Sequence, residues 1–226
     1  MKNLCIIPAR GGSKRIPRKN IKDFLGKPII AYSIEAAIQS ELFCDIMVST
    51  DDEEIANIAR IYGASVPFMR STLTSNDYAT TTDVINEVID CYEKLGMEYE
   101  TFTCIYSTAP FVCAEKLKEA YTMLKNDINS VFTCVSYSYP IQRALRFDDQ
   151  KIFMIQPQSL NSRSQDLEPT YHDAGQFYVC DIAEFRKMNS LWGKNTAGLV
   201  LSELEVQDLD SLTDWQLAEM KFKLTR

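Results

Sequence analysis

Short apolar runs recur along the chain and are separated by longer amphipathic segments. The first run, Leu4–Ile7, is apolar at every position, which is typical of a strand that is buried on both faces of a parallel sheet. Strands are expected from this pattern at residues 4–7, 46–48, around 66, 103–106, 130–135, 171–179 and 198–201.

Between these runs, hydrophobic residues return every three or four positions, as they do in helices with one buried face. Helices are expected to begin at Pro28, after Asp51 and Asp52, near Thr82, at Glu115, near Ile182 and just after Asp210. Strands that alternate with helices form right-handed crossovers and a parallel sheet. The pattern therefore predicts an α/β fold, in which the loops that follow the strands build the site. Those loops are residues 8–20, 49–52 and 107–110.

Residues 139–171 depart from this alternation. The segment contains three prolines, two Asp-rich turns and a short alternating run at residues 151–154, so no long helix fits it. We interpret it as a β-rich insertion within a single domain of residues 1–226. An exposed hairpin needs a covering surface, so a second subunit and hence a homodimer are expected. Its three arginines are either functional or solvated turn charges: Arg143, Arg146 and Arg163.

Charge is distributed unevenly along the chain. The first 27 residues contain eight Lys or Arg and one Asp, a charge of +7, so the remainder carries −14 of the total of −7. Nucleic-acid binding requires a broad positive face, which an acidic body does not offer. The balance favours a small polyanion that is held at one place.

The seven cysteines are scattered and include no Cys-x-x-Cys pair, which favours reduced, structural thiols over a metal or nucleophile role. No apolar run is long enough to span a bilayer, and no signal peptide opens the sequence. We therefore expect a cytoplasmic protein without a membrane partner.

The basic residues gather in a glycine-containing loop after the first strand. Gly11 and Gly12 let backbone N–H groups approach an anion, and Arg10, Ser13, Lys14 and Lys19 add side-chain donors in this loop. The spacing fits neither the Walker A motif nor the dinucleotide fingerprint. From these residues alone, the loop is either a polyanion site or a basic surface turn.

Three acidic or titratable features are candidates for chemistry. Asp208 and Asp210 are two residues apart on an extended segment, so both carboxylates point to one side and could hold Mg²⁺ together with substrate phosphates; the alternative is two surface acids before a helix. For Asp51 and Asp52, helix capping is favoured over metal binding. The single histidine, His172, is a candidate general base, although a structural or substrate-contacting role is more common beside a strand.

Several motifs together resemble the nonulosonic acid cytidylyltransferases, the CMP-sialic acid synthetase family, nearly from end to end. The similarity lies in Ile-Ile-Pro-Ala-Arg-Gly-Gly-Ser-Lys-Arg-Ile-Pro-Arg-Lys-Asn at residues 6–20, Ser-Thr-Asp at 49–51, Arg70, the threonines at 80–82, and Gln-Asp-Leu-Asp at 207–210. Two segments depart from the sialic acid branch: Tyr-Ser-Thr-Ala-Pro at 106–110 and His-Asp-Ala-Gly-Gln-Phe-Tyr at 172–178. The second, with residues 162–167, is similar to the pseudaminic acid cytidylyltransferases of bacteria that glycosylate flagellin.

This resemblance implies a three-layer Rossmann-like nucleotidyltransferase fold with a mostly parallel central sheet and a small β-rich dimerisation insertion. It implies that the anomeric hydroxyl of a nine-carbon sugar acid attacks the α-phosphate of CTP and releases pyrophosphate, with Mg²⁺ as cofactor. Pseudaminic acid is the expected acceptor, with sialic, legionaminic and 3-deoxy-octulosonic acids as alternatives. A non-catalytic nucleotide-binding protein of the same fold is the alternative from another class.

The resemblance also assigns residues to roles. Arg10, Lys14 and Lys19 would neutralise the triphosphate and act in catalysis, and Asp208 and Asp210 would hold the metal. The full nucleotide-binding set would be Ala9, Arg10, Gly11, Gly12, Ser13, Lys14, Lys19, Asn20, Arg70, Thr81 and Thr108. The sugar-binding set would be Arg163, which could come from a partner subunit, with His172, Asp173 and Gln176.

Overall fold

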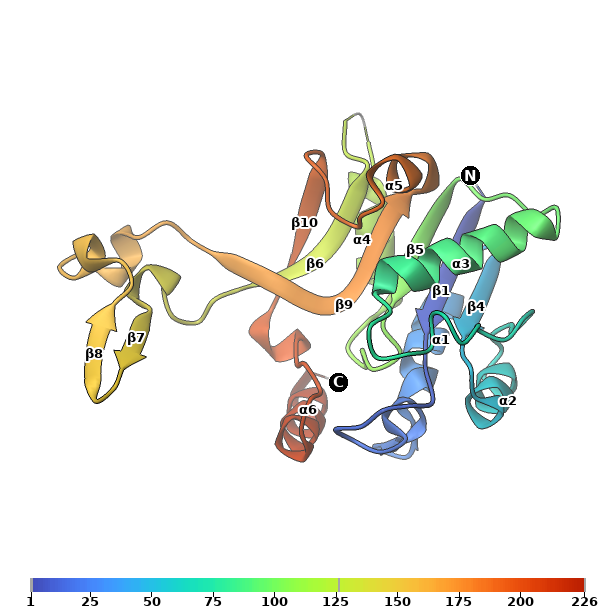
Figure 1. Ribbon diagram of the computed structural model, residues 1–226, viewed down its shortest axis with the longest axis horizontal. Helices are drawn as coiled ribbons and strands as arrows, with labels where there is room; N and C mark the ends of the chain where they lie inside the picture. The colour runs from blue at the N-terminus through green and yellow to red at the C-terminus, as the bar shows by residue number, and fades with distance from the viewer. Residues whose placement is uncertain (1, 126, 226) are drawn as a thin grey trace.

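A six-stranded sheet forms the centre of the computed structural model, which describes residues 2–125 and 127–225 (Figure 1). Its strand order is β10-β6-β9-β5-β1-β4. The strands are β1 (Asn3–Pro8), β4 (Asp45–Ser49), β5 (Thr101–Ile105), β6 (Ser130–Ser136), β9 (Tyr171–Asp181) and β10 (Thr196–Leu201). β1 runs parallel to β4 and β5, and β10 runs parallel to β6, whereas β9 is antiparallel to both of its neighbours. The predicted mostly parallel sheet is confirmed.

Helices cover both faces of this sheet. They are α1 (Ile29–Ser40), α2 (Glu53–Ile61), α3 (Thr81–Lys94), α4 (Ala114–Met123), α5 (Ile182–Met188) and α6 (Leu212–Thr225). In Figure 1, α3 and α5 lie in front of the sheet, and α1 and α4 lie behind it. On β1, Cys5 and Ile7 pack into the core on the α1 and α4 face, and Leu4 and Ile6 pack on the α3 and α5 face. All four are fully buried, which explains why this strand is apolar at every position.

A third, smaller core holds α6 against the segment that follows the basic loop. Trp215 of α6 contacts Phe24 edge to face, with ring centroids 5.6 Å apart. Phe24 belongs to the short hairpin of β2 (Asp23–Phe24) and β3 (Lys27–Pro28). Ile16 and Leu209 are buried in the same cluster. This core therefore joins the basic loop near the N-terminus to the segment that carries Asp208 and Asp210.

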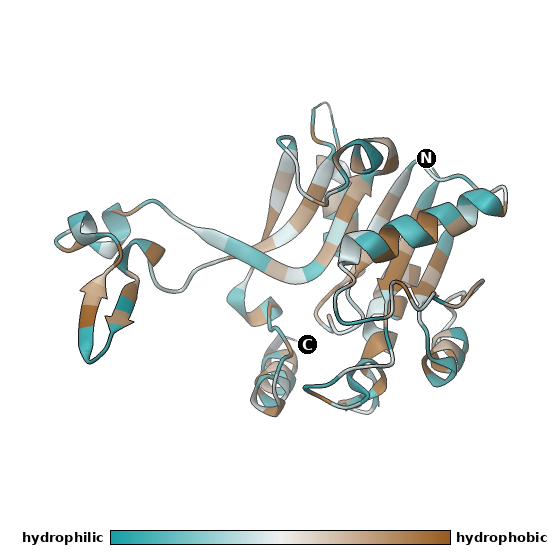
Figure 2. Ribbon diagram, viewed as in Figure 1, coloured by the Kyte–Doolittle hydropathy of each residue, from teal (hydrophilic) through white to brown (hydrophobic). Residues whose placement is uncertain are grey.

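The predicted exposed hairpin is present in the insertion. It consists of β7 (Leu145–Asp148) and β8 (Lys151–Met154), with three short 3₁₀ turns around it: η2 (Ile141–Arg143), η3 (Pro157–Ser159) and η4 (Ser164–Asp166). Figure 1 shows it projecting far from the sheet, and Figure 2 shows hydrophobic residues on its strands. Every residue of β7 is exposed. We call residues 139–171 the arm.

The expected strand around Val66 is wrong. Only one residue pair forms there, an isolated parallel bridge between Met47 and Ser65. Ser65 uses both of its backbone groups, because its N–H donates to the Ile46 carbonyl (2.7 Å) and its carbonyl accepts from the Val48 N–H (2.9 Å). Pro67 follows two residues later and has no N–H with which to continue the ladder.

All seven cysteines are free. Cys5, Cys104 and Cys180 lie inside the two main apolar clusters, and Cys134 is also buried, which supports the prediction of structural thiols. Among residues 2–125 and 127–225, none of the helices has the length and apolar character needed to cross a membrane.

Candidate active site

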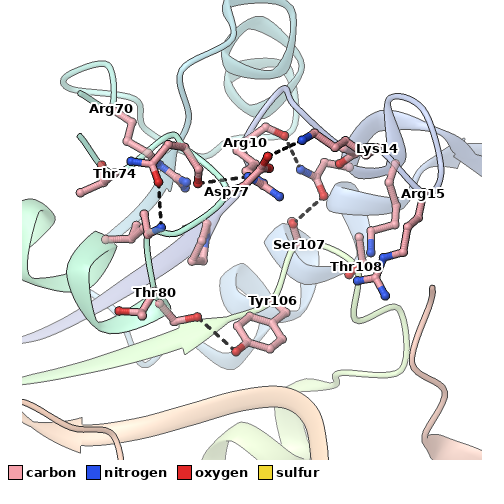
Figure 3. A pocket seen from close by; sticks show the side chains of 18 of the residues that line it. Arg10, Lys14, Arg15, Arg70, Thr74, Asp77, Thr80, Tyr106, Ser107 and Thr108 are labelled. Carbon is pink, nitrogen blue, oxygen red and sulfur yellow. Dashed lines mark hydrogen bonds and ion pairs between the residues drawn. The ribbon is translucent and has the colours of Figure 1, made fainter. Parts of the chain in front are cut away.

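The loops after β1 and β5 enclose a cavity of about 300 Å³ together with residues 70–84, which lead into α3; the loop after β4 does not line it. We call it the basic cavity (Figure 3). Its lining includes eight of the predicted nucleotide-binding residues: Arg10, Ser13, Lys14, Lys19, Asn20, Arg70, Thr81 and Thr108. Ala9, Gly11 and Gly12 do not line it. Ala9 is fully buried in the core, and its N–H donates to the Ser49 carbonyl (2.9 Å).

The basic loop is held in place by Asp51 and Asn20. The N–H of Gly11 donates to Oδ1 of Asp51 (2.9 Å). Asn20 is buried; its Nδ2 donates to the Arg10 carbonyl (2.8 Å), and its Oδ1 accepts from the Ser107 hydroxyl (3.0 Å). Because Asn20 lies in the short turn η1 (Lys19–Ile21), these bonds connect both ends of the loop to the exit of β5.

Asp52 caps α2, which confirms the capping interpretation for this residue. Its Oδ1 accepts from the N–H groups of Glu54 and Ile55, both at 3.0 Å. The same carboxylate binds Arg18, whose Nη2 lies 3.1 Å from Oδ1. Arg18 holds the pKa of Asp52 below its usual range, with the backbone bonds acting in the same direction. The Asp52 carboxylate therefore holds Arg18 of the basic loop against the start of α2.

Gly11 stands against Asp52 so closely that a side chain does not fit. A Cβ at position 11 would lie 2.7 Å from Oδ2 and 3.0 Å from Cβ of Asp52, whereas a Cβ at Gly12 would meet nothing within 4 Å. We expect Gly11→Ala to lower the free energy of unfolding by about 1–3 kcal/mol, because the cap of α2 must shift. Gly12→Ala is the matched control and should change it by less than about 0.5 kcal/mol. Urea unfolding measures both, and equal effects of the two variants would contradict the close packing.

Lys19 joins the basic loop to the acidic pair near the C-terminus. Its Nζ donates to the carbonyl of Leu209 (2.8 Å), a residue 190 positions away in sequence. Burial lowers the pKa of Lys19, and the carboxylates of Asp210 and Asp208 oppose this shift. Arg15 forms an ion pair with Asp210. The structure thus brings the predicted triphosphate residues and the predicted metal residues into one region.

The acidic pair offers a donor set that suits a hard cation. Asp208 is exposed, Leu209 is buried and Asp210 is partly exposed, as expected for alternating positions on an extended segment. No group of three or more His, Cys, Asp or Glu is placed to hold a metal within the described part of the chain. Two carboxylates nevertheless fit Mg²⁺, which proteins usually bind through one or two carboxylates, water and substrate phosphates. The helix-start prediction also holds, because Ser211 and Asp214 exchange hydrogen bonds at the beginning of α6.

Arg70 and Thr81 lie on the other side of the basic cavity. Arg70 is buried and donates through Nε to the Ser49 hydroxyl (3.0 Å), which fixes it at the exit of β4. Burial lowers the pKa of Arg70, and Asp51 and Glu87 oppose this. Thr81 begins α3, and its hydroxyl lies 3.3 Å from that of Tyr106.

The predicted sugar-binding residues are not gathered in the basic cavity. Arg163 lies in the arm and binds Asp166 through Nε (2.8 Å). Gln176 is buried and donates to the carbonyl of Glu205. His172 and Asp173 line a second cavity of about 350 Å³, which we call the aromatic cavity. Its other lining residues are Phe132, Cys134, Tyr171, Trp192, Gly198 and Val200.

A row of aromatic rings connects the two cavities. Tyr106 lines the basic cavity and contacts Tyr178, with centroids 5.7 Å apart. Tyr178 continues to Phe132 (6.3 Å), and Phe132 stacks on Trp192 (4.3 Å) in the aromatic cavity. Burial raises the pKa of Tyr178, so its hydroxyl stays protonated and donates to Asp173.

The structure also shows site residues to which the sequence assigned no role. Asp77 and Arg15 line the basic cavity and form ion pairs with the basic loop and with Asp210, respectively. Arg18 belongs to the loop and ties it to the start of α2 through Asp52. These pairs join residues 34 to 195 positions apart, so no local spacing could have predicted them.

Comparison with known proteins agrees with this geometry. A family model described as Cytidylyltransferase matches residues 4–191. The pseudaminic acid cytidylyltransferase of Campylobacter jejuni is 42% identical over 99% of this chain and 97% of its own length. The CMP-N,N'-diacetyllegionaminic acid synthase of Legionella pneumophila is 34% identical over 100% of this chain and 98% of its own.

The fold has a close structural counterpart. A solved structure of CMP:2-keto-3-deoxy-manno-octonic acid synthetase complexed with CTP matches over 100% of both chains, with a TM-score of 0.70 and 18% sequence identity. At that identity the match supports the fold, and the family rests on the sequence matches. These matches confirm the resemblance found in the motifs, and the chain belongs to the cytidylyltransferase family.

Proposed function

We propose that the protein joins CMP from CTP to the anomeric hydroxyl of a nonulosonic acid, with pseudaminic acid as the first candidate, and releases pyrophosphate. The observation that carries this proposal is the Lys19 contact with Leu209, which brings a cation of the basic loop beside Asp208 and Asp210. The Campylobacter jejuni relative, whose name specifies pseudaminic acid, supports the choice of acceptor.

The basic cavity supplies the groups that a triphosphate requires. Arg10, Lys14 and Lys19 are cations that neutralise phosphate oxygens and stabilise the charge that develops on the leaving group. Thr81 and Thr108 would contact the nucleoside, with Arg70 fixed at the cytosine end. Mg²⁺ held by Asp208 and Asp210 would add positive charge on the phosphates.

The reaction needs positioning and charge stabilisation more than a covalent intermediate. The oxygen of the anomeric hydroxyl forms a bond to the α-phosphorus as the bond from that phosphorus to the bridging oxygen breaks. Pyrophosphate takes the electron pair of the broken bond, and the hydroxyl proton is lost to solvent or to a base.

The acceptor sugar would lie between the two cavities. Tyr106 in the basic cavity, and Phe132 and Trp192 in the aromatic cavity, offer ring faces for the apolar faces of a sugar. His172 and Asp173 add polar contacts in the aromatic cavity. Arg163 would reach a sugar carboxylate from the arm of a partner subunit, because its own arm projects far from the sheet (Figure 1) and Arg163 does not line the basic cavity.

A pyrophosphate-release assay with CTP and a panel of sugar acids tests this function. We expect pseudaminic acid to give the highest kcat/KM, above the legionaminic, sialic and 3-deoxy-octulosonic acids. A higher kcat/KM for another sugar acid would support the proposed reaction but identify that acid as the substrate. Binding of CTP without turnover of any of these acids would favour the non-catalytic nucleotide-binding protein.

We also propose a homodimer that buries the arm. The arm exposes large hydrophobic side chains, with 85% of Tyr139 and 73% of Phe147 accessible. Light scattering at micromolar protein should therefore give twice the chain mass of 25.8 kDa, and Phe147→Asp should shift the protein toward the monomer. A monomeric mass for the unmodified protein would rule this assembly out.

A cytoplasmic location is part of the same proposal. Seven free cysteines suit a reducing compartment, and CTP is available there.

A further inference from the structure

The carboxylate of Asp77 lies between two cations of the basic cavity. Its Oδ1 is 2.8 Å from Nη1 of Arg10, and its Oδ2 forms an ion pair with Nζ of Lys14. The same Nη1 of Arg10 donates to the carbonyl of Asn76 (3.1 Å). Figure 3 shows Asp77 between Arg10 and Lys14. Two carboxylate oxygens thus use the same donors that two phosphate oxygens would use.

The segment that carries Asp77 is anchored at both ends. At its start, Oε1 of Glu87 in α3 accepts from the Ser71 N–H (2.7 Å), and Oε2 accepts from the Thr74 hydroxyl. At its end, Thr80 and Asp83 form a capping box at the beginning of α3. These contacts are made by residues on either side of Asp77, so they do not depend on its ion pairs.

Between these anchors, the segment is a small turn with Asp77 inside it. Oδ1 of Asn76 accepts from the N–H groups of Tyr78 (2.8 Å) and Ala79 (3.0 Å), so the turn keeps its shape by itself. Tyr78 is 94% exposed and adds no packing. The Asp77 side chain is 43% exposed, so it can leave its two partners for water at little cost.

We propose that Asp77 sets the affinity for the polyphosphate part of the ligands, because its carboxylate competes with phosphate oxygens for Arg10 and Lys14. This inference rests on the proposed function, which assigns the two cations to the triphosphate. Pyrophosphate must displace Asp77 to use these donors, and Asp77 returns to them as pyrophosphate leaves. Asp77 therefore weakens the binding of pyrophosphate and speeds its release.

Asp77→Asn tests the competition, because it removes the charge and keeps the size of the side chain. The product-inhibition constant of pyrophosphate should fall about tenfold, and KM for CTP should fall as well. Because pyrophosphate then leaves more slowly, kcat should not rise. Asp90→Asn is the matched control. Asp90 binds Arg186 outside the basic cavity, and its loss should leave both constants unchanged.

Pyrophosphate binding by calorimetry separates this inference from the proposed function. If the unmodified protein released no pyrophosphate from CTP and the sugar acids, the proposed function would fail, and the titration with pyrophosphate would still decide the role of Asp77. An unchanged or weaker affinity in Asp77→Asn would overturn the competition. If Asp77→Asn did not fold, Asp77→Ala would be titrated with pyrophosphate in its place, and we expect it to bind pyrophosphate more tightly than the unmodified protein.

Discussion

Replacing Lys19 by Ala is expected to lower kcat/KM for CTP at least tenfold, a loss of about 1.4 kcal/mol of transition-state stabilisation. Lys19 is buried enough for its pKa to be lowered, and its Nζ is held at 2.8 Å from the Leu209 carbonyl. A cation fixed in this way requires little reorganisation when negative charge develops on the leaving group. Steady-state pyrophosphate release with varied CTP measures the effect.

Lys22→Ala is the control for this prediction. Lys22 lies three residues further along the chain, does not line the basic cavity and has its Nζ over the ring of Trp215, 5.5 Å from the centroid. Its replacement removes the same charge from the same region, so kcat/KM should stay within about twofold of the unmodified protein. Equal losses of kcat/KM in Lys19→Ala and Lys22→Ala would show that Lys19 does not act in the site.

Much of the fold could be predicted because burial leaves a local pattern in the sequence. β1 lies inside the sheet, so all of Leu4–Ile7 had to be apolar, and this was visible in the sequence. Asp52 could be assigned as a cap because a helix N-terminus needs an acceptor within a few residues. The strand around Val66 failed because its apolar residues satisfied the pattern, whereas Pro67 limited the ladder to one bridge.

The site was predictable only in part, since its members come from distant segments. The glycines and cations of residues 10–20 lie together in sequence, so an anion site could be inferred from them alone. The contact of Lys19 with Leu209 depends on the packing of α6 against Phe24, which no local spacing encodes. Asp77 lies in a segment to which the sequence assigned neither a helix or strand nor a role. The placing of His172 and Asp173 in a second cavity likewise required the course of β9.

Replacing Asp208 by Ala is expected to have the largest effect, a loss of roughly 100-fold in kcat/KM at saturating Mg²⁺. The pair would keep only Asp210, which also forms an ion pair with Arg15, so metal affinity in the presence of CTP should fall as well. The loss also removes one of the two charges that raise the pKa of Lys19. With a lower pKa, Lys19 loses its proton earlier as pH rises, so the activity that remains should decline at a lower pH.

Asp214→Ala, at the third residue of α6, provides the contrast. Asp214 accepts from the hydroxyl and from the N–H of Ser211, both at 2.7 Å, at the start of α6, and these two bonds lower the pKa of Asp214. The loss of the Asp214 carboxylate should lower the free energy of unfolding by about 1 kcal/mol and leave kcat/KM nearly unchanged. Asp208→Ala should lower kcat/KM and leave the free energy of unfolding nearly unchanged. Kinetics measured over a Mg²⁺ series, with urea unfolding of both variants, distinguish the two roles. Near-normal pyrophosphate release by Asp208→Ala at saturating Mg²⁺ would show that Asp208 does not hold the metal.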